Sequence, residues 1–139
     1  MNNGVDLIPT LLEFANIPKP AALSGRSLKE EAIKNKNIKD RPYIVVENRM
    51  TQGGMIDGEK PVLNGRMVRS ERYKYCLYDL GEKKEELYDL NNDPGETINI
   101  AREKSSKEIL NQHRTYLSEF AKRYNDTLAL KMLKEINNK

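Results

Sequence analysis

One apolar stripe between residues 105 and 124 limits the folds open to this chain more than any other feature. Its members recur at three- and four-residue spacing: Ile109, Leu110, His113, Tyr116, Leu117, Phe120, Ala121 and Tyr124. This spacing is typical of a long helix that buries one face. Such a helix needs a second surface to cover, because a stripe cannot bury itself. Ser105 and Glu108 have the spacing of a capping box and predict that the helix begins at Ser105.

The surface to be covered is predicted to be a sheet, because four short segments before the helix have the composition of strands. They are rich in β-branched and aromatic residues and are bounded by polar turns. The predicted strands are Tyr43–Val46, Arg66–Arg69, Tyr73–Tyr78 and Glu86–Leu90, with a long irregular loop over Thr51–Gly65. The sequence therefore predicts an α+β fold: a small antiparallel sheet of about four strands, covered on one face by the long C-terminal helix. A shorter helix is expected to follow, around Leu128–Ile136.

A further helix is predicted near the amino end, between Asp6 and Ala15. Asp6 can cap it, and Pro9 falls in the first turn, where its missing N–H is harmless. The stripe of this helix is broad and strongly apolar, so we expect it to pack against a surface that this chain does not contain. Lys19–Arg41 is expected to be a connection with at most a short helix around Leu28–Ile33.

Composition excludes several classes of protein. The chain has 139 residues, which is enough for one modest core. Its net charge of +3, from 24 basic and 21 acidic residues, is too balanced for a dedicated nucleic-acid binder. No apolar run approaches the ~20 residues that cross a bilayer, so neither nucleic acid nor membrane is an expected partner. The compartment stays open, since a lone Cys76 forms no intramolecular disulfide and any export signal would lie upstream.

Four stretches together resemble one family. Val5–Pro18 and Gly25–Leu28 resemble the segment with which sulfatases of the arylsulfatase and sulfamidase type pass from their catalytic α/β domain into a C-terminal subdomain. Arg66–Tyr75 and Glu86–Thr97 are similar to the hairpin and the following strand and turn of that subdomain. Each stretch alone is common, but all four occur in the family's order.

The resemblance implies a division of the chain and a partner for it. Residues 1–41 would be a helix and linker left over from the edge of the catalytic domain, and residues 42–139 would be the C-terminal subdomain. The expected partner is the catalytic domain of the same polypeptide. Self-association of the chain alone is also expected, because apolar surface that the catalytic domain normally covers would be exposed.

No catalytic nucleophile is recognisable in this sequence. Sulfatases of this type use a formylglycine made from the Cys or Ser of a Cys/Ser-x-Pro-x-Arg motif. None of the six prolines here has Cys or Ser two positions before it, and Cys76 is expected to be a buried group on a strand. His113 is the sole histidine, and without a second histidine it is expected to lie at the edge of the core.

No calcium site is predicted in this chain either. Asp89, Asn91 and Asp93 have the alternating spacing of a calcium loop. Pro94 stands where that loop needs glycine, and Ile100 stands where it needs a bidentate glutamate, so an Asx turn is predicted instead. The chain is therefore expected to hold no cofactor, and formylglycine and calcium are expected in the absent catalytic domain.

Glu47, Asn48 and Arg49 are the first candidates for contact with substrate. They directly follow the first predicted strand, at a strand end where sheets commonly contact ligands. In the resembling sulfatases this part of the subdomain lies near the active-site mouth. A salt bridge across the domain interface is the alternative.

Arg66, Arg69 and Arg72 are the second candidates, with Lys74 beside them. Guanidinium groups bind sulfate or phosphate through paired hydrogen bonds, so these residues are candidates for contact with an oxyanion. The alternative is a solvated face of the hairpin.

The main hypothesis is a non-catalytic C-terminal fragment of a sulfatase. It would stabilise the catalytic domain and line part of the substrate pocket, and alone it is expected to show no sulfuric ester hydrolysis. The alternative is a free-standing binding module whose tyrosines and arginines grip an acidic glycan or nucleic acid.

Overall fold

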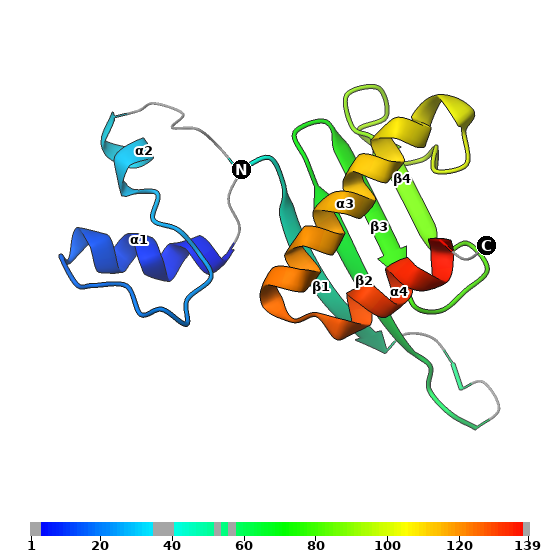
Figure 1. Cartoon of the computed structure of the whole chain (residues 1–139), viewed down its shortest axis with the longest axis horizontal. Helices are drawn as coiled ribbons and strands as arrows, with labels where there is room; N and C mark the ends of the chain where they lie inside the picture. The colour runs from blue at the N-terminus through cyan, green and yellow to red at the C-terminus, as the bar shows by residue number, and fades with distance from the viewer. Residues whose placement is uncertain (1–3, 35–40, 52–53, 56–57, 138–139) are drawn as a thin grey trace. The chain divides into compact units, whose positions relative to one another are not determined.

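The protein is described by a computed structural model over residues 4–34, 41–51, 54–55 and 58–137 (Figure 1). The chain divides into two compact units, Met1–Ile44 and Val45–Lys139. In the part of the chain that the structure describes, no helix is both long and apolar enough to span a bilayer.

The second unit is built on a four-stranded sheet. Its strands lie in the order β1 (Ile44–Thr51), β2 (Val62–Arg69), β3 (Tyr73–Tyr78) and β4 (Glu85–Asp89). The β2–β3 and β3–β4 pairs are antiparallel, and their registers place Val68 opposite Tyr75 and Tyr75 opposite Leu87. All three of these side chains are 0% exposed, so this row forms the centre of the core. The predicted hairpin and fourth strand are confirmed.

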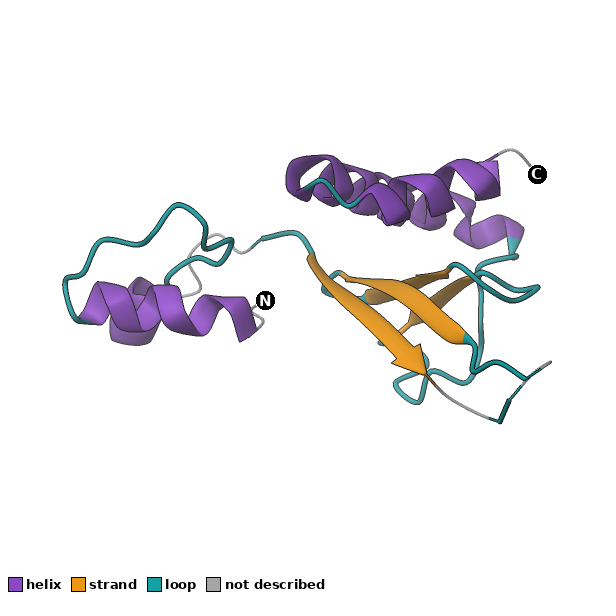
Figure 2. Cartoon of the chain, turned by 90° about the horizontal axis from the view of Figure 1, so that it is seen from below, coloured by secondary structure: helices purple, strands orange, loops and turns teal. Residues whose placement is uncertain are grey.

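Helices cover one face of this sheet, as Figure 2 shows. A short 3-10 turn, η2 (Lys104–Ser106), leads into α3 (Lys107–Tyr124), and α4 (Thr127–Asn137) returns beside it. Leu117 and Ala121 of α3 and Ala129 of α4 are fully buried, whereas Tyr124 remains 40% exposed. The predicted α+β fold with a long covering helix is therefore confirmed, although only part of the predicted stripe is buried.

Three predicted boundaries were wrong. α3 begins at Lys107, because the Ser105 hydroxyl lies in η2 and bonds to Glu103 rather than capping a helix. β1 continues to Thr51 instead of ending at Val46, and β2 begins at Val62, inside the predicted loop. Both strands continue through polar residues because backbone hydrogen bonds to a neighbouring strand hold them extended. The polar side chains themselves give no sign of this pairing in the sequence. Residues 52–53 and 56–57 of that loop lie outside the described residues.

The first unit is organised around Asp6. It comprises η1 (Gly4–Asp6), α1 (Leu7–Phe14) and α2 (Lys29–Lys34). Asp6 makes no side-chain cap; its carboxylate is 1% exposed and accepts bonds from the Arg26 N–H (2.9 Å) and from Arg41 Nη2 (2.7 Å). The Thr10 hydroxyl accepts a bond from the Leu28 N–H (3.0 Å). The returning segment is thus held against the polar side of α1.

Gly25 is required where this returning segment meets the chain before α1. A Cβ atom at residue 25 would lie 1.9 Å from the Val5 carbonyl oxygen, a distance that no real side chain tolerates. Only glycine allows this close approach of two backbones.

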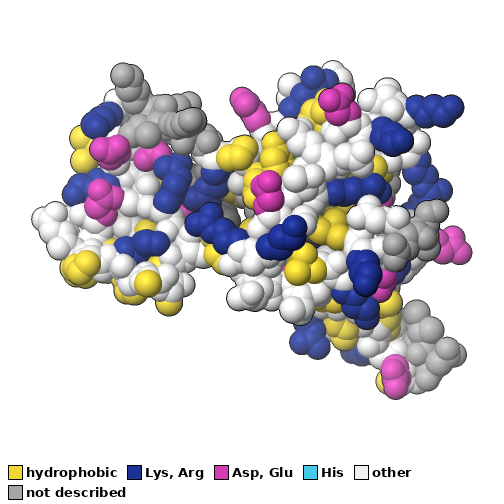
Figure 3. All heavy atoms as spheres, viewed as in Figure 1, with side chains coloured by type: hydrophobic (Ala, Val, Ile, Leu, Met, Phe, Trp, Pro, Cys, Tyr) yellow, Lys and Arg dark blue, Asp and Glu magenta, His cyan; other side chains and the backbone are white. Residues whose placement is uncertain are grey.

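The apolar side of α1 is left uncovered. Six side chains in and around the helix are 47–61% exposed: Val5, Leu7, Ile8, Leu11, Phe14 and Ile17. Figure 3 shows hydrophobic side chains gathered on the surface around this helix. The polar side holds the returning segment, so the apolar side is the one available for a partner.

Candidate functional site

Glu47, Asn48 and Arg49 lie inside β1 rather than after a strand, and all three are exposed. Successive strand residues point to opposite faces, so Glu47 and Arg49 share one face and Asn48 lies on the other. Glu47 Oε2 is 3.5 Å from Arg66 Nη2 of the neighbouring strand. The structure thus presents the three side chains within a regular edge strand, rather than at the strand end that the sequence suggested.

The Asn48 side chain lies close to Gly65 of the neighbouring strand β2. A Cβ atom at Gly65 would be 2.6 Å from Asn48 Oδ1 and 3.2 Å from the Tyr78 ring. The Asn48 amide therefore occupies space that only a glycine on β2 leaves available.

Arg66 is a buried residue that holds the helices to the sheet. Its side chain is 8% exposed, and it donates from Nε to Asp126 Oδ2 (2.5 Å) and from Nη2 to Asp126 Oδ1 (3.1 Å). The hydrogen bonds to Asp126 raise the pKa of Arg66. Asp126 also accepts the Ala129 N–H (3.0 Å) at the start of α4. One carboxylate therefore pairs with β2 and caps α4.

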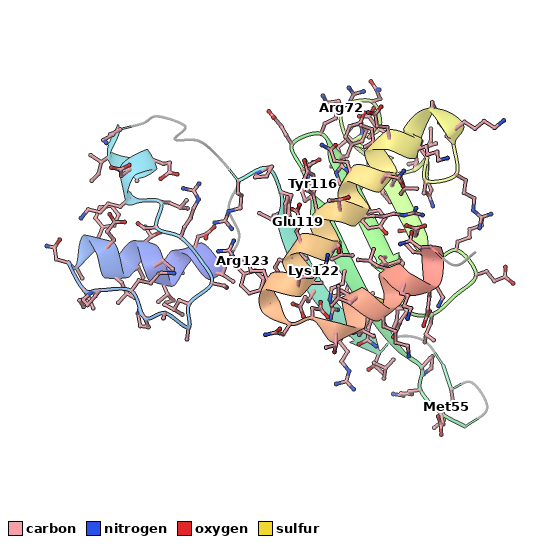
Figure 4. All side chains as sticks on the ribbon, viewed as in Figure 1. Met55, Arg72, Tyr116, Glu119, Lys122 and Arg123 are labelled. Carbon is pink, nitrogen blue, oxygen red and sulfur yellow. The ribbon has the colours of Figure 1, made fainter. Side chains whose placement is uncertain are left out.

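Arg69 and Arg72 have partners of their own. Arg69 Nη1 donates to the backbone carbonyls of Ser70 (2.6 Å) and Glu71 (3.0 Å). Arg72, which Figure 4 shows at the turn end of the β2–β3 hairpin, forms a paired contact with Asp89 (2.8 and 2.7 Å). The three candidate arginines are therefore not gathered into one site. Among the three, Arg69 bonds to backbone carbonyls and to no carboxylate of the described residues.

The Asp89 turn does not fit calcium. The bond from Arg72 holds the pKa of Asp89 at about 2, and the carboxylate also accepts bonds from the Asn91 N–H and the Asn92 amide. Asp93 accepts bonds from the Thr97 hydroxyl and the Ile98 N–H. The predicted Asx turn is confirmed. Across the described residues, no group of three or more His, Cys, Asp or Glu side chains could hold a metal ion.

Cys76 is buried, as predicted, whereas His113 lies inside the core rather than at its predicted edge. Cys76 is 5% exposed, and burial raises the pKa of its thiol. His113 is 1% exposed and packs edge-on against the Tyr73 and Tyr116 rings. Its Nδ1 lies 2.8 Å from the Ile109 carbonyl and its Nε2 lies 2.9 Å from Ser70 Oγ. This geometry assigns a neutral ring that donates from Nδ1 and accepts the Ser70 hydroxyl at Nε2.

Acid is expected to destabilise the protein through His113. Burial lowers the pKa of His113 below its ordinary value of 6.5. Below pH 6.5 the His113 imidazole binds a proton in the unfolded chain but stays neutral in the folded chain. The unfolding free energy therefore falls as pH decreases, by at most about 1.4 kcal/mol per pH unit. The loss ends once folded His113 is also protonated. Urea unfolding followed by circular dichroism should show this slope below pH 7, and His113→Leu should flatten it; an unchanged slope in that variant would contradict the assignment.

The comparisons with known proteins identify the family. The model of the family "N-sulphoglucosamine sulphohydrolase, C-terminal" matches residues 1–123. This chain belongs to that family. It is the C-terminal domain of a sulfatase-family protein, and the predicted resemblance is confirmed.

Individual relatives agree with this assignment. The chain is 39% identical over 122 residues to a Delta 4,5-hexuronate-2-O-sulfatase of Bacteroides thetaiotaomicron, covering 88% of this chain and 24% of that protein. It is 35% identical over 105 residues to human arylsulfatase K, covering 70% of this chain and 18% of that protein. The solved structure of a 2-O GAG sulfatase superposes with a TM-score of 0.70 at 39% identity, over 87% of this chain and 25% of that chain. The chain thus spans a quarter or less of the length of these relatives.

Proposed function

We propose that this chain completes a sulfatase whose chemistry lies in a catalytic α/β domain of the same polypeptide. The first unit docks on that domain through the apolar side of α1, and the second unit lends one wall to the substrate pocket. The uncovered apolar side of α1 carries this proposal. The described residues offer no nucleophile motif and no metal cluster, so the formylglycine and calcium of such enzymes are assigned to the catalytic domain.

Docking through α1 is favoured because its apolar side is exposed and its polar side is already occupied by the returning segment. Fully burying one Leu, Ile or Phe side chain is worth roughly 1.5–3 kcal/mol. Leu7 and Leu11 are 61% and 55% exposed, and Phe14 is 48% exposed, so much of this stabilisation is unrealised in the chain by itself. Asp6 and Thr10 on the polar side already hold the returning segment. A partner that covers α1 must therefore cover its apolar side.

The pocket wall is assigned to Glu47, Asn48 and Arg49. A ligand contact needs side chains that are exposed and held by a rigid element, and β1 provides both. The Arg49 side chain makes no hydrogen bond or ion pair with another described residue, so its guanidinium is available to an anionic group of a substrate. For an oxyanion on the hairpin, Arg69 is the better candidate, because Arg66 and Arg72 each already bind a carboxylate.

A chimera tests the docking role. In it, this chain replaces the matching C-terminal segment of the B. thetaiotaomicron sulfatase. The chain alone should release no sulfate from a sulfated hexuronate, whereas the chimera should be active. Leu7→Asn with Leu11→Asn should reduce the yield of active chimera at least about tenfold, because each substitution places an amide in the buried contact.

Leu80→Asn is the matched control, since Leu80 is 49% exposed but belongs to the second unit. Equal activity with and without the α1 substitutions would overturn the docking role, as would metal-dependent turnover by the chain alone. In the same chimera, Arg49→Gln should raise KM more than it lowers kcat, whereas Arg102→Gln should change neither. Unchanged KM in Arg49→Gln would remove Arg49 from the pocket wall.

A further inference from the structure

β1 is an edge strand of the described sheet, and no described strand pairs with its outer side. It stands first in the strand order, and no described strand lies beyond it. Its eight residues form a regular strand without proline or glycine. An edge of this kind presents a row of backbone N–H and C=O groups that can pair with another strand.

We propose that two copies of this chain pair along β1, antiparallel, about a two-fold axis at Asn48. In this register Glu47 of each copy lies opposite Arg49 of the other, and Val46 lies opposite Met50. Two ion pairs and two apolar pairs form from one short strand. The sheets of the two copies join into one continuous sheet.

The charges select this register over its neighbours. A slip of two residues in one direction places Glu47 opposite Glu47 of the second copy, and a slip in the other direction places Arg49 opposite Arg49. Like charges directly opposite each other destabilise a strand pair, and opposite charges contribute roughly 0.2–1 kcal/mol per pair. A slip of one residue would turn the helices of the two copies to opposite faces of the joined sheet.

The surroundings of Glu47 and Arg49 favour the pairing as well. Glu47 is 54% exposed on its side chain and lies 3.5 Å from Arg66, which is itself paired with Asp126. Arg49 of the second copy would place a cation on the other side of this carboxylate. On the opposite face, the 40% exposed side chain of Val46 would be covered by Met50 of the second copy.

Self-pairing and the pocket-wall role use the same side chains. A paired chain therefore cannot line a substrate pocket, and docking on the catalytic domain should separate the pair. The pairing is a property of this chain alone, so it can be tested without any activity measurement, and its failure leaves the proposed sulfatase role untouched.

Sedimentation velocity over increasing protein concentration tests the proposal. The unchanged chain should form dimers. Arg49→Glu should raise the dissociation constant at least about tenfold, because both ion pairs become Glu–Glu contacts. Glu47→Arg should do the same through Arg–Arg contacts. Arg102→Glu is the matched control and should dimerise normally, since Arg102 is exposed and lies outside β1.

Mixing the two charge variants provides the decisive measurement. Glu47→Arg and Arg49→Glu each repel themselves but are complementary to each other, so an equimolar mixture should form heterodimers as tight as the unchanged dimer. Circular dichroism melts must first show that each variant is folded. A chain that stays monomeric at high concentration, variants that dimerise normally, or a mixture that remains monomeric would overturn the proposal. If Leu11→Asn abolishes the dimer and Arg49→Glu does not, the contact between copies lies on α1 and the β1 pairing is wrong.

Discussion

Asp126→Ala is expected to lower the unfolding free energy of the second unit by about 3–5 kcal/mol. The Asp126 carboxylate is 7% exposed on its side chain and neutralises Arg66, which is 8% exposed. Removing it leaves the buried guanidinium with only the half-exposed Glu47 carboxylate, 3.5 Å away, and leaves the Ala129 N–H without an acceptor at the start of α4. Burial pushes the pKa of Asp126 up, but the bonds from Arg66 and Ala129 outweigh it and the pKa lies below its ordinary value. Urea unfolding at pH 7 measures the loss.

Two further variants separate the contributions at this site. Asp126→Asn keeps an acceptor for the Ala129 N–H and should lose less, because asparagine caps helices about as well as aspartate. Arg66→Met combined with Asp126→Ala removes the stranded charge and should be more stable than Asp126→Ala alone. A loss below about 1 kcal/mol in Asp126→Ala would mean that the pair contributes no more than a surface ion pair does.

Glu85→Ala is expected to cost about 2–4 kcal/mol, because two side chains depend on its carboxylate. Glu85 Oε1 accepts the Tyr75 hydroxyl (2.7 Å), and Tyr75 is 0% exposed. Arg114 of α3 donates to both carboxylate oxygens (2.8 and 2.5 Å). Alanine would leave a buried hydroxyl without an acceptor and would release α3 from β4.

The control for this prediction lies three residues earlier. Glu82 is exposed in the β3–β4 turn, so Glu82→Ala should change the unfolding free energy by no more than about 0.5 kcal/mol. Glu85→Gln retains an acceptor for Tyr75 and loses the charge opposite Arg114, so it should fall between Glu82→Ala and Glu85→Ala. Equal stability of Glu82→Ala and Glu85→Ala would show that the Tyr75–Glu85–Arg114 contacts do not hold α3.

In the proposed function, the contacts of Arg66 with Asp126 and of Glu85 with Arg114 would fix the scaffold behind β1. Arg66 joins β2 to the start of α4, and Glu85 joins β4 to α3. The side chains of β1 can therefore be presented with defined positions to a substrate or to a second copy. Rigid support of this kind is what a binding surface requires.

The candidate site was only partly predictable. Glu47, Asn48 and Arg49 stood out because three polar residues follow an apolar run, but they were assigned to a strand end. Only the neighbouring β2 reveals that the strand continues through them to Thr51. The roles of Asp126 and Glu85 were missed, because a carboxylate gives no local signal of a partner 60 or 29 residues away.

The sequence by itself determined the local secondary structure of this chain and its lack of a nucleophile motif. The composition of Tyr73–Tyr78 and the apolar spacing of residues 105–124 are properties of short stretches of chain, so they predicted a strand and a helix, although the helix begins at Lys107. The lack of a nucleophile motif is likewise a property of the sequence alone. Tertiary structure decided which charges became buried pairs and which side of α1 stayed open. Those outcomes depend on long-range packing: Arg66 pairs with Asp126 only when the start of α4 is brought to β2, and the apolar side of α1 stays open because Asp6 and Thr10 hold the returning segment on the other side.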